Sequence, residues 1–252
     1  MIKLFDAHFH IIDYQYPISS NQGYSPPTFL VEDYLQAMQG FDLVGGALVS
    51  GSFQGFDQAY LLAALEKLGP NFVGVTQLPA TTTDEEIIAL DKKGVRALRF
   101  NIKRGGSEGV SQLNFLGNRV YDLVGWPVEL LVDSSELGAL KEEILKLPVV
   151  SVDHMGLSSS GYKDLLSLVE QGVYVKASGF GRLDFDVLKA LKQMYTINPH
   201  ALRFGSDLPS TRAPIPFKAA DVSLIVDNME STAVEDILYK NALTFYRVHE
   251  MY

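Results

Sequence analysis

The stretch Lys3-Leu-Phe-Asp-Ala-His-Phe-His10 predicts a short strand that ends in two histidines. Side chains two positions apart on a strand leave from the same face. His8 and His10 are therefore expected to point into one space, and Asp6 is expected to share their face. Ionisable groups on an otherwise apolar strand cost free energy unless that face lines a site. We therefore expect a functional site at the end of this strand, with partners from elsewhere in the chain.

Composition narrows the class of protein. The chain has 252 residues, 47% of them hydrophobic, and a net charge of −9, which argues against nucleic acid or an anionic membrane surface as a partner. It has no cysteine, which excludes disulfides and thiolate metal sites and suits the cytoplasm. No apolar run approaches the roughly 20 residues of a membrane span, and no signal-peptide pattern precedes the first strand. We expect a cytoplasmic protein, with homo-oligomerisation left open.

Strand-like and helix-like segments alternate along the chain. Short apolar runs bounded by turn residues are typical of buried strands. After the first strand, the predicted strands are 44–50, 72–78, 95–101, 127–133, 149–154, 173–178 and 202–207. The predicted helices are 29–38, 56–68, 84–93, 113–124, 136–147, 162–170, 185–195, 217–228 and 234–247.

This alternation indicates parallel strands joined by right-handed crossovers. Eight strand–helix units in a chain of this length are typical of a (β/α)8 TIM barrel, whose usual size is about 250 residues. An open doubly wound sheet is the alternative, but it would carry a glycine-rich phosphate loop after its first strand. The sequence after His10 has no such loop. We therefore predict an α/β protein with one domain, 1–252, built as a TIM barrel with extra C-terminal helices.

Polar side chains gather at the carboxyl ends of the predicted strands, where TIM barrels place their active sites. They are His8, His10, Ser50, Gln77, Arg99, Asn101, Asp133, His154, Lys176, Ser178 and Asp207. His154 and Asp207 supply the partners that the first-strand histidines require. We predict that these four residues meet at one mouth of the barrel as the catalytic cluster. His200 and His249 lie away from strand ends and are expected at the surface.

Three segments carry a family resemblance: Phe5-Asp-Ala-His-Phe-His10, Val152-Asp-His-Met-Gly156 and Phe204-Gly-Ser-Asp-Leu-Pro209. They resemble the signatures of the amidohydrolase superfamily, in its amidohydrolase-2 branch. Segments 94–101 and 173–179 fit the same branch, so the resemblance extends from the first strand to the last. Within the branch the chain looks closest to the 2-pyrone-4,6-dicarboxylate lactonases and related lactonases.

The resemblance implies a hydrolase that opens a lactone, a cyclic ester, of a small carboxylated molecule. From the groups present, Asp207 is expected to be the general base that activates water, because a semi-apolar mouth raises the pKa of a carboxyl group. His154, with His8 and His10, is expected to polarise the scissile carbonyl and to hold the developing oxyanion.

A metal ion is the open question at this site. His8, His10 and Asp207 could hold one zinc ion and leave a coordination position free. The metal-dependent members of the superfamily usually add a histidine on the fifth strand, and here that strand ends in Leu130-Leu-Val-Asp133. Arg99 would also repel a nearby cation. We therefore expect no required cofactor, and one divalent metal such as zinc remains the alternative.

Basic residues lie at or beyond several strand ends although the chain is acidic overall. Arginine suits the bidentate binding of carboxylates, so we expect a small anionic substrate. The predicted substrate-binding residues are Arg99, Asn101, Arg182, Arg212 and Tyr24. Arg104 is interpreted as a solvated loop charge.

Two further charged residues have structural interpretations. Lys176 shares the inward face of the seventh strand, and we expect it to pair with Asp6 as a buried ion pair. Asp153 has the opposite strand phase to His154, so we expect it to face a helix or to anchor a loop.

Two alternatives to lactone hydrolysis stay open. One is a metal-dependent amidohydrolase-type hydrolase or decarboxylase that acts on an aromatic or muconate-type acid. The other is a non-catalytic barrel that binds a carboxylated metabolite, although binding alone does not need a general base.

Overall fold

The computed structural model describes residues 1–248, so His249 lies outside the described residues. Within this range the strands form one parallel sheet in sequence order. They are β1 (Lys3–Phe9), β2 (Asp42–Val49), β3 (Phe72–Thr76), β4 (Val95–Asn101), β5 (Val128–Leu131), β6 (Val150–Val152), β7 (Tyr174–Ser178) and β8 (Leu202–Gly205).

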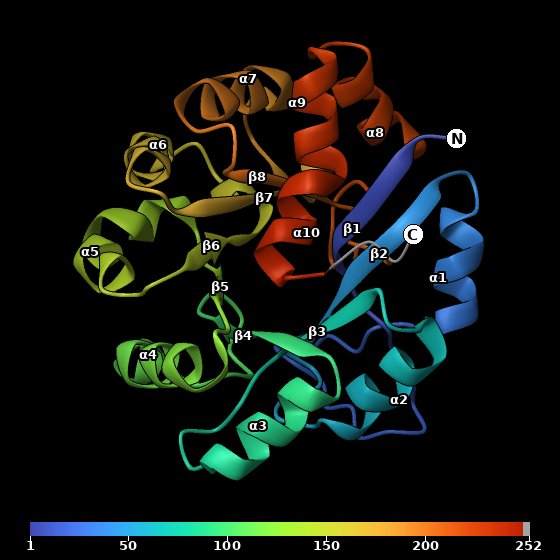
Figure 1. Cartoon of the computed structure of the whole chain (residues 1–252), viewed down its shortest axis with the longest axis vertical. Helices are drawn as coiled ribbons and strands as arrows, with labels where there is room; N and C mark the ends of the chain where they lie inside the picture. Colours follow the sequence, from blue (N-terminus) through green and yellow to red (C-terminus); the bar gives the residue numbers. More distant parts are fainter. Residues whose placement is uncertain (249–252) are drawn as a thin grey trace.

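Helices surround the sheet (Figure 1). The α-helices are α1 (Val31–Met38), α2 (Ala59–Leu68), α3 (Asp84–Lys92), α4 (Leu113–Val124), α5 (Ser134–Leu145), α6 (Tyr162–Glu170), α7 (Val187–Ile197), α8 (Ala219–Val226), α9 (Ser231–Glu235) and α10 (Asn241–Tyr246). Short 3₁₀-helices are η1 (Val110–Gln112), η2 (Asp153–Gly156) and η3 (Phe180–Arg182), and η4 (Asp236–Lys240) is a π-helical segment between α9 and α10. The predicted (β/α)8 TIM barrel with extra C-terminal helices is confirmed.

The two edge strands meet at their C-terminal ends and close the barrel there. The backbone N–H of Asp207 donates to the His8 carbonyl at 2.7 Å, and the N–H of His10 donates to the Leu208 carbonyl at 2.8 Å. These bonds place residues from the first and last strands side by side although about 200 positions separate them. Closure of the barrel therefore also assembles the site.

Apolar side chains fill the barrel and the layer outside it. Phe5, Ala47 and Val75 belong to the inner cluster, whereas outward residues of the strands pack beneath the helices in a larger cluster. At the end opposite the site, α10 crosses the barrel (Figure 1), and its Tyr246 ring stacks on Phe5 with centroids 5.7 Å apart. The barrel interior is thus a packed core with one closed end and one polar end.

A bulge in β1 places Asp6 on a different face from the two histidines. The pairing register between β1 and β2 shifts between Asp6 and Phe9. Both residues contact Tyr34 on α1, Asp6 by a hydrogen bond of 3.2 Å and Phe9 by stacked rings, so both face outward. The prediction that Asp6 shares the face of His8 and His10 is wrong, because the bulge interrupts the strand period of two.

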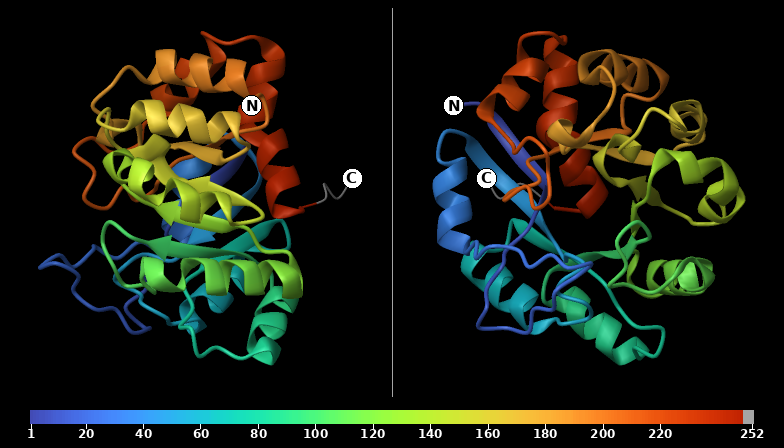
Figure 2. Two further views of the ribbon diagram at one scale, coloured as in Figure 1. Left: turned by 90° about the vertical axis from the view of Figure 1, so that its left-hand side faces the viewer. Right: turned by 180° about the vertical axis from the view of Figure 1, so that it is seen from behind.

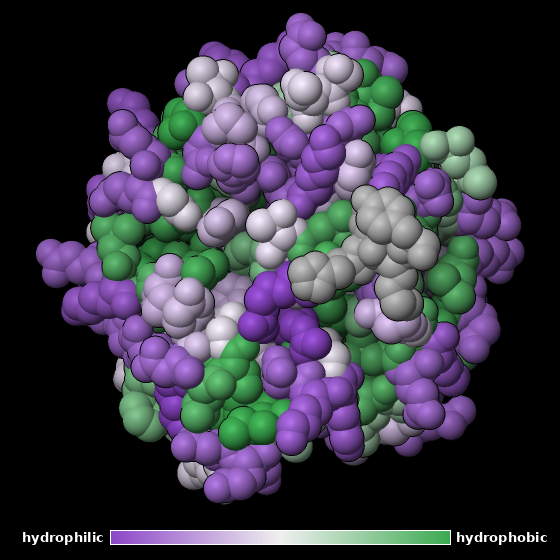
Figure 3. Space-filling view, viewed as in Figure 1, coloured by the Kyte–Doolittle hydropathy of each residue, from purple (hydrophilic) through white to green (hydrophobic). Residues whose placement is uncertain are grey.

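The loop between β1 and α1 lies at the polar end of the barrel, away from α10 (Figure 2). On the face opposite that loop, hydrophilic side chains cover much of the outer helices, and apolar ones show in smaller groups between them (Figure 3). Among residues 1–248, none of the helices has the length and apolar character needed to cross a membrane.

Candidate active site

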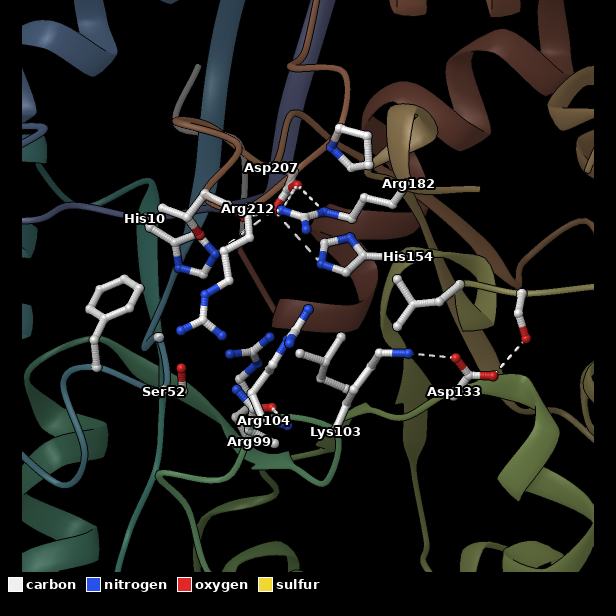
Figure 4. A pocket seen from close by; sticks show the side chains of 18 of the residues that line it. His10, Ser52, Arg99, Lys103, Arg104, Asp133, His154, Arg182, Asp207 and Arg212 are labelled. Atoms are coloured by element: carbon white, nitrogen blue, oxygen red, sulfur yellow. Dashed lines mark hydrogen bonds and ion pairs between the residues drawn. The ribbon is translucent and has the colours of Figure 1, made fainter. Parts of the chain in front are cut away.

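A cavity of about 370 Å³ opens at the C-terminal ends of the strands (Figure 4). Its ionisable lining residues are His10, Arg99, Lys103, Arg104, Asp133, His154, Arg182, Asp184, Asp207 and Arg212. Cationic side chains outnumber the carboxylates on this lining, in contrast to the net charge of −9 for the whole chain. The cavity is therefore suited to an anionic ligand.

Asp207 is held by one of its two carboxylate oxygens. Arg182 contacts Oδ2 through Nε and Nη2, each at 2.7 Å, while Oδ1 is buried and has no hydrogen-bond partner. The backbone of Asp207 lies in the left-handed region with φ 61°, at the point where β8 turns into its loop. A buried carboxylate oxygen without a partner is costly, so Oδ1 is a candidate atom for contact with a ligand.

Three imidazole rings surround that oxygen. The distances from Asp207 Oδ1 to the Nε2 atoms are 3.9 Å for His8, 3.9 Å for His10 and 3.7 Å for His154. The structure therefore brings together the four residues that the sequence predicts as the catalytic cluster. His10 and His154 line the cavity, whereas His8 is fully buried behind them.

Hydrogen bonds orient the two rings that face the cavity. His10 Nδ1 lies 2.7 Å from the Val49 carbonyl oxygen, which can only accept, so Nδ1 carries the proton and Nε2 presents a lone pair. His154 Nδ1 lies 2.9 Å from Ser178 Oγ, and a serine hydroxyl can donate to it. In both rings, a hydrogen bond thus holds Nδ1, the nitrogen that faces away from the cavity.

Burial sets the charge states of the cluster. It lowers the pKa of His10 to about 3, with help from Arg99, and it lowers the pKa of His8 and of His154 well below the ordinary value. All three rings are neutral near pH 7. Burial raises the pKa of Asp207 to about 6, and the Arg182 guanidinium opposes a larger rise. At neutral pH the carboxylate is therefore mostly ionised and still basic enough to accept a proton.

Asp153 is fully buried beneath the cavity, where it contacts Arg99 and Lys176, and does not lie against a helix. After Val152 the chain turns into η2, where His154 adopts φ 49° and ψ 43°, so His154 lines the cavity while Asp153 lies below it. Arg99 donates to Asp153 Oδ2 through Nε at 3.2 Å and Nη2 at 3.0 Å. Although burial opposes ionisation, Lys176 and Arg99 hold the pKa of Asp153 well below its usual range. The predicted helix-facing or loop-anchoring role is wrong, because the strand ends before this residue.

Lys176 pairs with Glu129 inside the barrel. Its ammonium contacts the Glu129 carboxylate, which also accepts a hydrogen bond from the Tyr246 hydroxyl of α10. Lys176 Nζ lies 3.3 Å from His8 Nδ1, directly beneath the cluster. The predicted pairing with Asp6 is wrong, because the bulge in β1 turns Asp6 outward.

Four of the five predicted substrate-binding residues, Arg99, Asn101, Arg182 and Arg212, line the cavity. Arg99 donates through Nη1 to the Ser50 carbonyl at 2.7 Å. Arg182 donates through Nη2 to the Thr211 carbonyl at 2.7 Å. Asn101 accepts the backbone N–H of Arg104 at 2.9 Å and so shapes the turn after β4. These hydrogen bonds hold the basic side chains of the cavity lining in place before a ligand binds.

Arg212 and Arg104 converge on the outer mouth from different loops. Both donate to Gln22 Oε1, at 3.5 Å and 3.1 Å, and among residues 1–248 neither forms an ion pair with a carboxylate within 4.0 Å. Burial, followed by the charge of Arg104, lowers the pKa of Arg212. The fifth predicted residue, Tyr24, supports Arg212, whose guanidinium lies 4.6 Å from its ring centroid, and does not line the cavity.

Sequence reasoning missed two basic residues of the lining, Lys103 and Arg104. Lys103 pairs with Asp133 at 2.5 Å, and Arg104 was interpreted as a solvated loop charge. The signal in the sequence is a group of basic residues at the end of the fourth strand and just after it: Arg99, Lys103 and Arg104 fall within six positions. The turn after β4 folds the last two back over the mouth.

The donor set around Asp207 fits a divalent cation by kind and spacing. One potential ligand atom each from His8, His154 and Asp207 lies within 4.8 Å of the others, all buried, and neutral imidazole and carboxylate are zinc ligands. The predicted set of His8, His10 and Asp207 shares two of these residues, and His10 Nε2 lies 3.9 Å from the same carboxylate oxygen. The unpartnered Oδ1 of Asp207 is consistent with such a use.

Comparison with known proteins places the chain in a family. A family model for amidohydrolases matches residues 5–248. A 4-sulfomuconolactone hydrolase of Rhizobium radiobacter is 24% identical over 227 residues, which cover 81% of this chain and 75% of that protein. A 2-pyrone-4,6-dicarboxylate hydrolase of Comamonas testosteroni is 25% identical over 156 residues, which cover 60% of this chain and 51% of that protein.

Solved structures show the same fold. A probable 2-pyrone-4,6-dicarboxylic acid hydrolase of Acinetobacter baumannii, crystallised with citric acid, has a TM-score of 0.83 and 22% identity over 97% of this chain and 99% of that one. An apo structure from Agrobacterium tumefaciens has a TM-score of 0.84 and 18% identity over 100% of this chain and 98% of that one. With the family match from end to end of the described barrel, the chain belongs to the amidohydrolase family and is a hydrolase.

Proposed function

We propose that this chain hydrolyses the lactone of a small carboxylated acid, with Asp207 as the general base. The observation that carries the proposal is the buried, unpartnered Oδ1 of Asp207 at the base of a cavity lined by cations. Because Arg182 occupies Oδ2, Oδ1 is the atom left to bind and deprotonate a water molecule.

The reaction follows from these groups. Asp207 Oδ1 takes a proton from water as the water oxygen attacks the lactone carbonyl carbon. His154, whose Nδ1 faces the Ser178 hydroxyl, directs Nε2 into the cavity to donate to the developing oxyanion. The bond to the ring oxygen then breaks, and that oxygen receives the proton that Asp207 holds. The Nε2 atoms of His8 and His10 lie 3.9 Å from Asp207 Oδ1 and give this step no proton.

The names of the relatives support a cyclic ester as the substrate. One is named for the hydrolysis of a sulfonated muconolactone and the other for that of a 2-pyrone dicarboxylate. Both compounds are lactones that carry anionic groups. The structure from Acinetobacter baumannii holds citric acid, a tricarboxylic acid.

The mouth supports recognition of an anionic group away from the scissile bond. Arg104 and Arg212 point toward the cavity (Figure 4) and, within the described part of the chain, have only neutral hydrogen-bond acceptors. Planar guanidinium groups bind carboxylate or sulfonate oxygens well. We assign the pair to a second anionic group of the substrate.

The proposed hydrolysis does not require a metal ion, because Asp207 is already ionised near neutral pH and His154 already faces the carbonyl position. A divalent cation, if bound, would be held by His8, His154 and Asp207 and would supply Lewis-acid polarisation of the carbonyl. In either state Asp207 remains the group that handles the proton, and the arginines still bind the anionic substituents.

A substrate screen tests the proposal. Opening a lactone at neutral pH releases one proton, so a weakly buffered indicator assay follows turnover without a chromogenic substrate. The panel contains pyrone carboxylates, muconolactones and lactones of sugar acids, with an uncharged lactone of equal ring size as the control. Each is assayed with protein stripped by chelator and with added zinc, alongside metal analysis of the purified protein.

Turnover of at least one carboxylated lactone by stripped protein, with little turnover of the uncharged control, supports the proposal. Release of CO₂ from an aromatic or muconate-type acid by metal-loaded protein alone would establish the decarboxylase alternative instead. Saturable binding without turnover of any member would favour the non-catalytic barrel.

A further inference from the structure

Beneath the cluster, four buried residues form a chain of contacts from the closed end of the barrel to His8. They are Tyr246, Glu129, Lys176 and Asp153, and all four are fully buried. None lines the cavity, and the proposed reaction gives none of them a step. Burying charged groups in a barrel costs free energy, and such groups are often retained because they fix a specific geometry.

The proton on His8 can be assigned from both sides of its ring. On the cavity side, His8 Nε2 lies 3.3 Å from His10 Nε2, and a contact between two nitrogens at this distance needs one proton between them. His10 cannot supply it, because its proton is on Nδ1 and donates to the Val49 carbonyl at 2.7 Å. His8 Nε2 therefore carries the proton.

The other nitrogen of His8 meets a donor. Lys176 Nζ lies 3.3 Å from His8 Nδ1, and an ammonium group has no lone pair, so Nδ1 must accept. Asp153 Oδ1 is the competing partner: it would accept a proton from Nδ1, but it lies at 3.7 Å, farther than the lysine, and is itself 3.6 Å from the Lys176 ammonium. The two sides of the ring thus give the same tautomer.

We propose that Lys176, held by Glu129, is a positioning residue that fixes the Nε2–H tautomer of His8 and thereby disfavours a metal ion in the cluster. A metal ligand must present a lone pair, so His8 could bind a cation only after its proton moved to Nδ1. There the N–H would point at the lysine ammonium. This inference rests on the proposed function in placing His8 in the active site, but its tests need no turnover.

The direct test is ring-nitrogen NMR of the metal-stripped protein labelled with ¹⁵N-histidine. The chain has five histidines, and His8→Asn identifies the signals of His8. The protonated nitrogen of His8 is expected to be Nε2 in the wild type. A wild-type His8 with its proton on Nδ1 would overturn the proposal, and this measurement needs no folded variant of Lys176.

Zinc titration against a competing chelator supplies the second readout. Lys176→Met with Glu129→Gln removes the ion pair without leaving a buried charge alone, and is expected to bind zinc at least about tenfold more tightly, because second-shell partners of histidine ligands typically change metal affinity by that order. The same variant is expected to show proton density on Nδ1 of His8, directed at Asp153.

The matched control is Lys103→Met with Asp133→Asn, which removes another lysine–carboxylate pair at the same cavity but no contact to His8. It is expected to leave both the His8 tautomer and the zinc affinity close to wild type. Equal tightening by the two double variants would show a general effect of charge and contradict the proposal, as would unchanged affinity in both. Failure of lactone hydrolysis would leave these results standing, because neither readout involves a substrate.

Discussion

Arg182 binds Oδ2 of Asp207 at 2.7 Å and leaves Oδ1 of the same carboxylate without a hydrogen-bond partner. Burial raises the pKa of Asp207 and the ion pair with Arg182 lowers it, which gives a value of about 6. The ion pair also keeps the Asp207 side chain in place. This balance yields a base that is ionised at neutral pH yet stronger than an exposed aspartate.

The activity should depend on one ionisation near pH 6. Asp207 must be unprotonated to accept a proton from water, and its pKa is raised to about 6, so kcat/KM is expected to fall about tenfold per pH unit below that value and to level off above it. Initial rates from pH 4.5 to 8.5, with structural integrity checked by circular dichroism, measure the profile. A plateau that continues unchanged to pH 4.5 would exclude Asp207 as the titrating base.

The two arginines at the mouth should govern substrate affinity. Arg104→Met with Arg212→Met is expected to raise KM by about tenfold or more and to change kcat little, because the lost contacts are the same in the ground state and the transition state. Steady-state kinetics on a doubly anionic lactone measures the split. Arg119→Met, which removes an arginine paired with Asp84 on the outer helices, is the control and should leave KM unchanged.

The ion pair between Arg99 and Asp153 should contribute to stability. Arg99→Met leaves a buried carboxylate without its closest donor, and we expect a loss of about 3 kcal/mol in the free energy of unfolding. Because the folded-state pKa of Asp153 is depressed, this contribution is present above the ordinary aspartate pKa and declines as pH falls below it. Urea unfolding at pH 7 and pH 3 measures both effects, and Arg99→Met with Asp153→Asn should lose less than the two single variants combined.

Ser178 should act through the orientation of His154. Its Oγ lies 2.9 Å from His154 Nδ1, and Ser178→Ala removes that contact from a buried ring. The loss of one hydrogen bond of about 1 kcal/mol is expected to lower kcat several-fold with little change in KM. Ser178→Thr, which keeps the hydroxyl, should retain most of the activity, and an equal loss in both variants would indicate disturbed packing and not a lost hydrogen bond.

The barrel and most of the cluster could be predicted because each strand carries its own signal. Alternating apolar runs and helical segments predict the (β/α)8 order, and closure of that order brings His8 and His10 to Asp207. The family resemblance rested on the same residues, and the family match confirms it. Polar residues at strand ends are therefore enough to predict which side chains meet in the proposed catalytic cluster.

The errors arose where the backbone leaves the regular strand. A bulge between Asp6 and Phe9 reverses the expected face of Asp6, and left-handed backbone at His154 places that side chain in the cavity lining while Asp153 stays buried below it. Neither feature has a signal in the periodicity of side chains, since both depend on contacts made after the barrel closes. For the same reason the partner of Lys176 was predicted as Asp6 and found to be Glu129.

The central claim is that Asp207 is the base in the hydrolysis of a carboxylated lactone. The most direct measurement is the turnover of the best lactone in the panel by wild type and by Asp207→Asn, with ligand binding measured for both by calorimetry. We predict that the variant still binds the lactone and that kcat falls by about 10²–10⁴-fold. A variant that binds and hydrolyses the lactone as fast as wild type would contradict the account.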